Sequence, residues 1–178
     1  FYSKILSPCL NKFINYFPQS LAPNLITLMS FFFNILSFYI TLMDGGLDYY
    51  SILSRGTCLF QAVAHILYYV LDNLDGKQAR RTGTSTAYGM LLDHGCDVFT
   101  NIIVAFNMSH LLILGSNNFI SFLFFSGLFL GFFSLTYQEY IFGELLLPEI
   151  NGANEGNLLI VIFSLVGFFF GCGIYRNK

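Results

Sequence analysis

The chain has 178 residues, of which 55% are hydrophobic, 19% aromatic and only 10% charged, and its formal net charge is -2. A soluble domain usually carries about 25% charged residues. This composition, with 22 phenylalanines, excludes a soluble enzyme, a disordered chain and a nucleic-acid binder. The four cysteines lie far apart without a C-x-x-C pair, which excludes a secreted disulfide scaffold and argues against a zinc site.

The first 20 residues are expected to form an interfacial segment. Over residues 1–17, apolar side chains recur at near-helical spacing with lysines and asparagines between them. This pattern is typical of an amphipathic helix that lies along the bilayer surface. Pro8 falls inside the segment, so a break or a late helix start is an equal alternative.

Four stretches contain no Asp, Glu, Lys or Arg and have the length of membrane spans. They cover residues 25–43, 56–71, 98–138 and 156–175. A helix needs about 20 apolar residues to cross about 30 Å of hydrocarbon, so the third stretch is long enough for two crossings. The sequence predicts an all-α, polytopic membrane protein with about five transmembrane helices, over residues 25–43, 51–71, 90–114, 119–142 and 157–175.

These crossings divide the basic residues between the two faces of the membrane. One face carries five of them, namely Lys4, Lys12, Lys77, Arg80 and Arg81, and the other carries Arg55, Arg176 and Lys178. Because basic residues accumulate on the cytosolic side, the first face is predicted to be cytosolic. The chain begins with Phe1 and its last span ends almost at its last residue, so we expect a piece of a longer protein.

Acidic residues concentrate where the second and third spans meet. Four of the ten, Asp72, Asp75, Asp93 and Asp97, fall within 26 positions. Carboxylates against hydrocarbon are costly unless they face a wet cavity and a cation. Their spacings of three and four residues put each pair on one helical face. Two facing pairs make an all-oxygen site for a hard divalent ion such as Mg²⁺ or Mn²⁺.

Residues between the two acidic pairs are suited to a phosphate ligand. Lys77, Arg80 and Arg81 can balance phosphate charge. Gly76 and Gly89 lack a side chain, which lets a ligand approach the backbone closely. We therefore expect residues 72–97 to form a catalytic motif, with Ala79 among its substrate-binding residues.

The residues from Asp72 to Asp97, with Gly76, Ala79, Arg80 and Gly89, read D-x2-D-G-x2-A-R-x8-G-x3-D-x3-D. This pattern resembles the signature of the CDP-alcohol phosphotransferase family without a departure. The segments DNLDGKQARRTG, LLDHGCD, LAPNLITL and LPEINGANEG are similar to its choline/ethanolamine phosphotransferase branch. The resemblance covers most of the chain.

The resemblance implies the N-terminal, catalytic half of an enzyme, with residues 1–178 in a single membrane domain. Such enzymes use two metal ions to displace CMP from a CDP-alcohol. In this branch the hydroxyl of diacylglycerol attacks CDP-choline or CDP-ethanolamine, giving phosphatidylcholine or phosphatidylethanolamine. The family also implies a membrane of the endoplasmic reticulum or Golgi and a possible homodimer.

By motif position, the resemblance makes Asp72, Asp75 and Asp93 metal ligands, with Asp97 a fourth ligand or the base. A carboxylate bound to metal is a poor base, whereas a neutral imidazole near pH 7 can take a proton. The base role is therefore divided between His94, which is slightly favoured, and Asp97. Asn24, at the mouth of the first span, is expected to hydrogen-bond the nucleotide or phosphate.

The alcohol headgroup is expected near the cytosolic ends of the fourth and fifth spans. Aromatic faces with a carboxylate usually hold a quaternary ammonium, and this region contains Tyr137, Glu139, Tyr140, Glu144 and Glu155. Related sequences often carry Trp-Glu where this chain has Tyr137 and Gln138. The preference between choline and ethanolamine therefore stays open.

Two other functions remain as alternatives. Another CDP-alcohol phosphotransferase would use inositol or glycerol 3-phosphate as the acceptor, although the sequences DHGCD and INGANEG argue against it. A transporter or channel would bind cations at the aspartates without chemistry.

Overall fold

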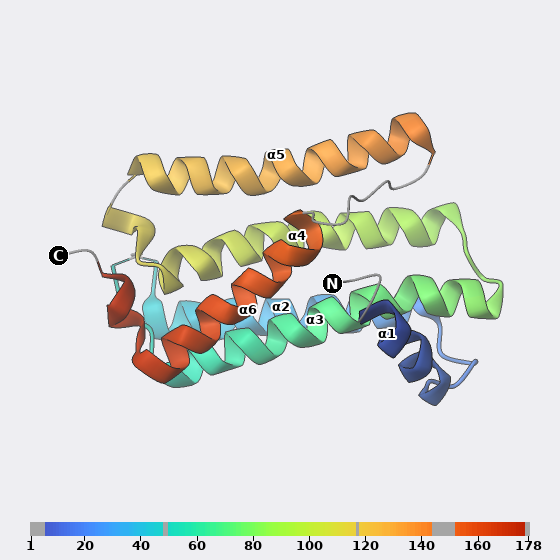
Figure 1. Cartoon of the computed structure of the whole chain (residues 1–178), viewed down its shortest axis with the longest axis horizontal. Helices are drawn as coiled ribbons and strands as arrows, with labels where there is room; N and C mark the ends of the chain where they lie inside the picture. Colours follow the sequence, from blue (N-terminus) through green and yellow to red (C-terminus); the bar gives the residue numbers. More distant parts are fainter. Residues whose placement is uncertain (1–5, 48–49, 117, 144–151, 177–178) are drawn as a thin grey trace.

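The computed structural model describes residues 6–47, 50–116, 118–143 and 152–176, and all regular elements in these ranges are helices (Figure 1). The longer helices are α1 (Ser7–Phe13), α2 (Pro23–Gly45), α3 (Arg55–Thr82), α4 (Ala87–Leu111), α5 (Asn118–Phe142) and α6 (Gly152–Phe170). Short 3-10 helices cover Ile14–Tyr16, Leu114–Ser116 and Cys172–Tyr175. The all-α prediction is confirmed for the described residues.

Three of these helices are long and apolar enough to cross a membrane. They are α2, α4 and α5, and their candidate spans are Pro23–Gly45, Ala87–Leu111 and Phe119–Phe142. The predicted count of five spans stays a prediction. The helix α3 continues past the predicted end at Leu71 through the charged motif, and this charged half lowers its hydropathy.

The last helix ends earlier than the apolar pattern predicts. We expected a span over residues 157–175, whereas α6 ends at Phe170 and a 3-10 helix follows. Gly171 lies between them with a φ of 84°. Glycine adopts this left-handed conformation without a steric penalty, and it commonly ends helices.

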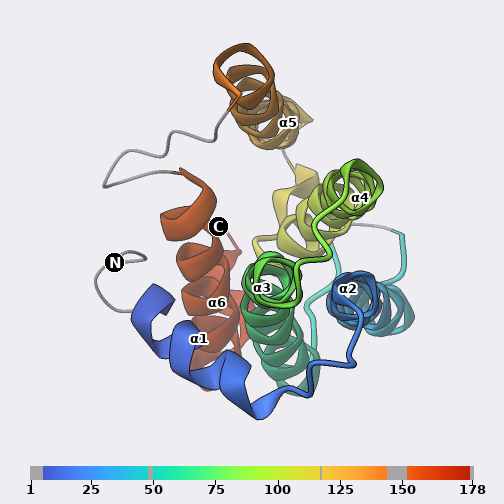
Figure 2. The ribbon, with the colours of Figure 1, turned by 90° about the vertical axis from the view of Figure 1, so that its right-hand side faces the viewer.

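The helices form a bundle in which α2 packs against both α3 and α4. On the opposite side, α6 runs along α3, as the end-on view in Figure 2 shows. The helix α5 lies beside α4 and apart from the other helices, and none of the residues in its most apolar stretch is buried. Among the helices, α5 therefore packs mainly against α4.

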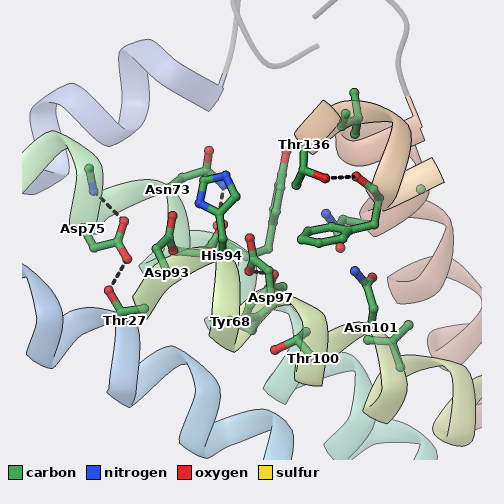
Figure 3. A pocket seen from close by; sticks show the side chains of 18 of the residues that line it. Thr27, Tyr68, Asn73, Asp75, Asp93, His94, Asp97, Thr100, Asn101 and Thr136 are labelled. Atoms are coloured by element: carbon green, nitrogen blue, oxygen red, sulfur yellow. Dashed lines mark hydrogen bonds between the residues drawn. The ribbon is translucent and has the colours of Figure 1, made fainter. Parts of the chain in front are cut away.

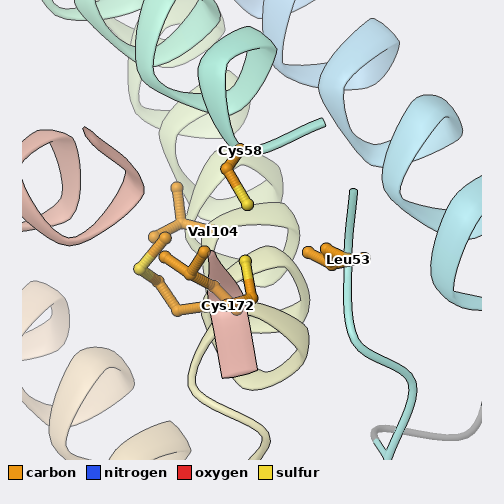
Figure 4. Packing of buried hydrophobic residues seen from close by; sticks show 6 residues of the cluster. Leu53, Cys58, Val104 and Cys172 are labelled. Atoms are coloured by element: carbon orange, nitrogen blue, oxygen red, sulfur yellow. The ribbon is translucent and has the colours of Figure 1, made fainter. Parts of the chain in front are cut away.

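Two apolar clusters hold the bundle together. One contains Leu53, Cys58, Val104, Met108, Leu111 and Cys172, close to where α3 begins and α6 ends (Figure 4). The other contains Leu10, Ile14, Ile26, Leu71 and Leu74 and joins the N-terminal segment to α2 and α3. Close packing in the first cluster depends on Gly167, because a Cβ there would lie 3.0–3.2 Å from atoms of Leu111, Cys58 and Cys172.

The N-terminal segment is helical from Ser7 as described, with Pro8 in its first turn. Proline is tolerated there because its missing N–H has no partner inside the helix. Leu10 and Ile14 face the bundle, whereas Phe13 and Tyr16 are exposed. This two-sided pattern agrees with an amphipathic segment, and its place at the bilayer surface stays a prediction.

One turn of α3 holds this segment through its side chains. The Lys77 ammonium donates to the Ser7 hydroxyl at 3.0 Å and to the side-chain oxygen of Asn11 at 2.7 Å. The Arg81 guanidinium donates to the backbone carbonyls of Ile14 and Phe17 at 2.7 and 2.9 Å. The side-chain amide of Gln78 also donates to the backbone carbonyls of Pro18 and Leu21, each at 3.0 Å.

We expect Arg81→Ala to loosen the N-terminal segment. A hydrogen bond from a charged group contributes about 1.5–3 kcal/mol, so amide hydrogen exchange in residues 7–16 should become about 10 to 100 times faster. Exchange measured by mass spectrometry on the full-length protein checks this. The control is Arg80→Ala, because the Arg80 guanidinium lies beside Gly76. Equal exchange in both variants would contradict the role of Arg81.

Candidate active site

A short turn between α3 and α4 places the two carboxylate pairs at similar distances from the turn, one pair on each helix. Gly83 ends α3 with a φ of 67°, and the Thr86 side chain caps α4 by accepting from the Gly89 amide at 3.1 Å. Asp75 lies seven residues before the last residue of α3, and Asp93 lies six residues after the first of α4. At about 1.5 Å per residue, both lie about 10 Å from the turn.

Three carboxylates converge between α3 and α4. Asp72, Asp93 and Asp97 each offer an oxygen, and these oxygens lie within 4.8 Å of one another. The Tyr68 hydroxyl donates to Asp97 at 2.9 Å, and Figure 3 shows Asp93, Asp97 and Tyr68 side by side. One buried oxygen of Asp93 has no hydrogen-bond partner among the described residues. An all-oxygen group with an unpaired buried oxygen fits a hard divalent ion.

The fourth predicted ligand, Asp75, lies apart from this group and faces α2. One of its carboxylate oxygens accepts from the Thr27 hydroxyl and the other from the Gly76 amide. Asp75 lies beyond the predicted second span, and burial raises its pKa to about 6 against the opposing effect of these two hydrogen bonds. Its charged form is therefore costly without a nearby cation. Coordination of metal by Asp75 stays a prediction.

His94 lines the same cavity as the carboxylates and is tied to α5. Its Nδ1 donates to the Met90 carbonyl at 2.9 Å, and its Nε2 lies 3.0 Å from Glu139 Oε2. Because a carbonyl only accepts, Nδ1 carries a hydrogen in this arrangement. The Nε2 atom and the Glu139 carboxylate then share a proton. Glu139 therefore fixes the imidazole ring over the carboxylates.

The carboxylates form one end of a cavity of about 1150 Å³. Along α4 its wall passes from Asp93 and Asp97 to Val104 and Met108, and about 15 residues of helix span about 22 Å. The wall opposite is apolar and consists mainly of Phe124, Leu128, Phe132 and Leu135 on α5 with Leu159, Ile160 and Phe163 on α6. The cavity therefore offers a charged end and a long apolar end.

Five residues predicted to bind substrate line this cavity: Asn24, Gly76, Ala79, Arg80 and Gly89. A Cβ at Gly76 would lie 3.4 Å from the Arg80 guanidinium, and one at Gly89 would lie 3.2 Å from the Asn24 side-chain oxygen. The two glycines thus provide space for the polar side chains of Arg80 and Asn24. Ligand contacts of these five residues stay predictions.

The other predicted cations do not line the cavity. Lys77 and Arg81 bind the N-terminal segment instead, and burial lowers the pKa of Lys77. At about 100° per residue, Lys77 and Arg81 lie about 140° and 180° around the helix from Asp72, whereas Arg80 lies about 80° away. This helical spacing can be read from the sequence, and it distinguishes Arg80 from Lys77 and Arg81.

The predicted headgroup residues are only partly brought together. Glu139 lines the cavity, but the exposed side chains of Tyr137 and Tyr140 do not. Glu155 lies in the first turn of α6, outside the lining, although the two residues that follow it line the cavity. Glu144 lies outside the described residues.

Sequence reasoning did not identify Thr27 and Tyr68 as site residues. Tyr68 lies four residues before Asp72, so the two share a face of α3. Thr27 lies three residues after Asn24, on the same face of α2. Helical spacing from the predicted residues was therefore the available signal.

Residues 20–147 match the model of the family described as CDP-alcohol phosphatidyltransferase. The chain is 34% identical over 163 residues to choline/ethanolaminephosphotransferase 1 of Arabidopsis thaliana, which covers 89% of this chain and 40% of that protein. It is 32% identical over 174 residues to cholinephosphotransferase 1 of Gallus gallus, covering 97% of this chain and 51% of that protein.

A protein of Dictyostelium discoideum, named as an uncharacterized class-I member of the same family, is 35% identical over 181 residues. That match covers 98% of this chain and 43% of that protein. The chain thus spans about half or less of the length of these relatives. Together with its apolar helices, these matches make it an integral membrane protein, and it belongs to the CDP-alcohol phosphatidyltransferase family.

Proposed function

We propose that the full-length protein transfers phosphocholine or phosphoethanolamine from CDP-choline or CDP-ethanolamine to diacylglycerol. The products are CMP and phosphatidylcholine or phosphatidylethanolamine. The observation that carries this proposal is the cavity that joins three convergent carboxylates to a long apolar end. The names of the Arabidopsis and Gallus relatives support the two headgroups.

The two ends of the cavity suit the two parts of the reaction. A diphosphate needs cations, and Arg80 is a lining residue that carries one. Asn24 also lines the cavity, next to Gly89, and can hydrogen-bond the nucleotide or a phosphate. The acyl chains of diacylglycerol would bury apolar surface against α5 and α6, which is favourable in proportion to the area removed from water.

The metal ions of the proposal are Mg²⁺ or Mn²⁺, two of them as the family resemblance implies. Asp72, Asp93 and Asp97 would hold them, and Asp75, which faces α2 in this structure, would be the fourth ligand. The fit rests on the oxygen-only donor set and on the unpaired buried oxygen of Asp93. When bound, such ions neutralise diphosphate charge and ease the departure of CMP.

His94 is the favoured base in this proposal. The diacylglycerol oxygen attacks the phosphorus that bears the alcohol, and the bond from this phosphorus to the CMP oxygen breaks. Because Nδ1 already carries a hydrogen, the hydroxyl proton passes to Nε2 of the neutral ring, at a moment when the contact of Nε2 with Glu139 is open. Glu139 stabilises the resulting imidazolium through the contact at 3.0 Å. Asp97 remains the alternative base, but it already accepts from Tyr68 and belongs to the carboxylate group.

The orientation and location are also part of the proposal. Lys77, Arg80 and Arg81 lie at the end of the molecule that carries the carboxylates, and basic residues favour the cytosolic side. We place the active site at the cytosolic surface of an endoplasmic reticulum or Golgi membrane. A homodimer rests on the family resemblance alone.

The experiment that tests the function uses the full-length protein in vesicles that contain diacylglycerol. CDP-choline and CDP-ethanolamine compete in one assay that measures both phospholipid products and CMP. We expect product formation with CMP release, and loss of both on chelation of divalent ions. Cation binding without CMP release would instead favour a transporter, and product formation only with inositol or glycerol 3-phosphate would favour the other acceptors.

We expect Asp75→Asn to lower turnover by at least about 100-fold. Loss of a residue that only supports a metal ligand lowers activity by about 10 to 100-fold, and loss of a ligand itself should lower it further. The protein should remain folded, since asparagine keeps an oxygen that can accept from Thr27. Product formation is measured beside size-exclusion profiles. The control, Asp44→Asn, removes one negative charge where Asp44 accepts from the Ser54 amide and should keep near-normal activity. Retained turnover in Asp75→Asn would count against metal catalysis.

We expect His94→Ala to lower kcat by about 10² to 10⁴-fold, the usual contribution of a general base, with little change in KM. Glu139→Gln should lower kcat less, because the ring remains but loses its charged partner. Steady-state kinetics with varied diacylglycerol measures both constants. Near-normal kcat in His94→Ala would transfer the base role to Asp97.

A further inference from the structure

A second, much smaller cavity lies inside the bundle, between α2, α3, α4 and α6. Its volume is about 10 Å³, and its polar lining residues are Asn34, Ser37, Gln61, His65 and Asn107. A cavity needs roughly 10–15 Å³ of such volume to hold one water molecule. Its size therefore suits a single water and excludes a larger ligand.

Three buried amide side chains surround this cavity, and each keeps one atom unpaired. Asn34, Gln61 and Asn107 are 2%, 3% and 5% exposed. The nitrogen of Gln61 donates to Thr41 at 2.8 Å, and that of Asn107 donates to Ser37 at 3.0 Å. Within the described residues, the oxygens of Gln61 and Asn107 and the nitrogen of Asn34 have no hydrogen-bond partner.

We propose that this cavity binds one ordered water molecule, which donates to the oxygens of Gln61 and Asn107 and accepts from the nitrogen of Asn34. A buried polar atom without a partner is costly, and buried waters typically make about three hydrogen bonds to such atoms. Two acceptors and one donor match the capacity of water. A cation would be repelled by the amide hydrogens of Asn34.

The proposed water joins the three helices that carry the carboxylates and their hydrogen-bond partners. Asn34 belongs to α2 with Thr27, Gln61 to α3, and Asn107 to α4. Apolar contacts give little preference for one helix register in a lipid environment, where interhelical hydrogen bonds and close packing specify it. The water therefore acts as a positioning ligand for the bundle, remote from the reacting groups.

The direct test is a structure of the full-length protein at a resolution that shows ordered water. We expect a density peak within hydrogen-bonding distance of Asn34, Gln61 and Asn107. Absence of a peak, with the amides bonded directly to one another, would overturn the proposal. So would a peak that disappears when sodium is removed from the buffer, because the ligand would then be a cation.

Variants provide a second test. Asn34→Leu and Gln61→Leu should each lower the melting temperature of the full-length protein in detergent by about 3 °C or more. The double variant should lose less than the sum, since both side chains bind the same water. The control is Ser109→Ala, whose hydroxyl donates within α4, to the Ala105 carbonyl at 2.7 Å, and it should change little. Additive losses would overturn the shared water.

Discussion

Mutual repulsion between carboxylates removed from water is the constraint on which this structure depends. Asp72, Asp93 and Asp97 meet where α3 and α4 face each other, and hydrogen bonds relieve only part of their charge. Tyr68 donates to Asp97, while one oxygen of Asp93 has no protein partner among the described residues. The charged form of such a group is costly without positive charge nearby, which supports the proposed divalent ions.

The same constraint explains why the site lies at a boundary between two environments. The charged end of the large cavity is surrounded by polar atoms from α2, α3 and α4, whereas α5 and α6 contribute a mainly apolar wall, with Ser134, Thr136, Glu139 and Asn157 as its polar residues. His94 and Glu139 join these two regions through one contact between α4 and α5. A substrate with a charged head and apolar tails therefore matches the cavity along its whole length.

Helix content and the acidic site could be predicted from the sequence because both depend on short-range patterns. Stretches without charge gave the approximate positions of the helices, and spacings of three and four gave the carboxylate faces. The partners of these carboxylates could not be predicted in this way. Thr27 is 48 residues from Asp75 and Glu139 is 45 residues from His94, so these contacts depend on how helices cross in space.

Charge alone does not settle the roles of Lys77 and Arg81, and their contact with a phosphate stays a prediction. A basic side chain can neutralise a phosphate or bind carbonyl groups, and the sequence motif does not distinguish these uses. Their position around α3 turns them toward the N-terminal segment, where carbonyls of Ile14 and Phe17 accept from Arg81. Asp75 differs from its three neighbours for a similar reason, because its face of α3 packs toward α2.

The hairpin of α3 and α4 has a consequence for biosynthesis. Tyr68 and the convergent aspartates all lie within 30 consecutive residues, so their contacts close only short loops, which form with a small entropic cost. The apolar wall, in contrast, needs α5 and α6, which leave the ribosome later. A nascent chain can thus assemble its acidic centre before the apolar wall of the cavity exists.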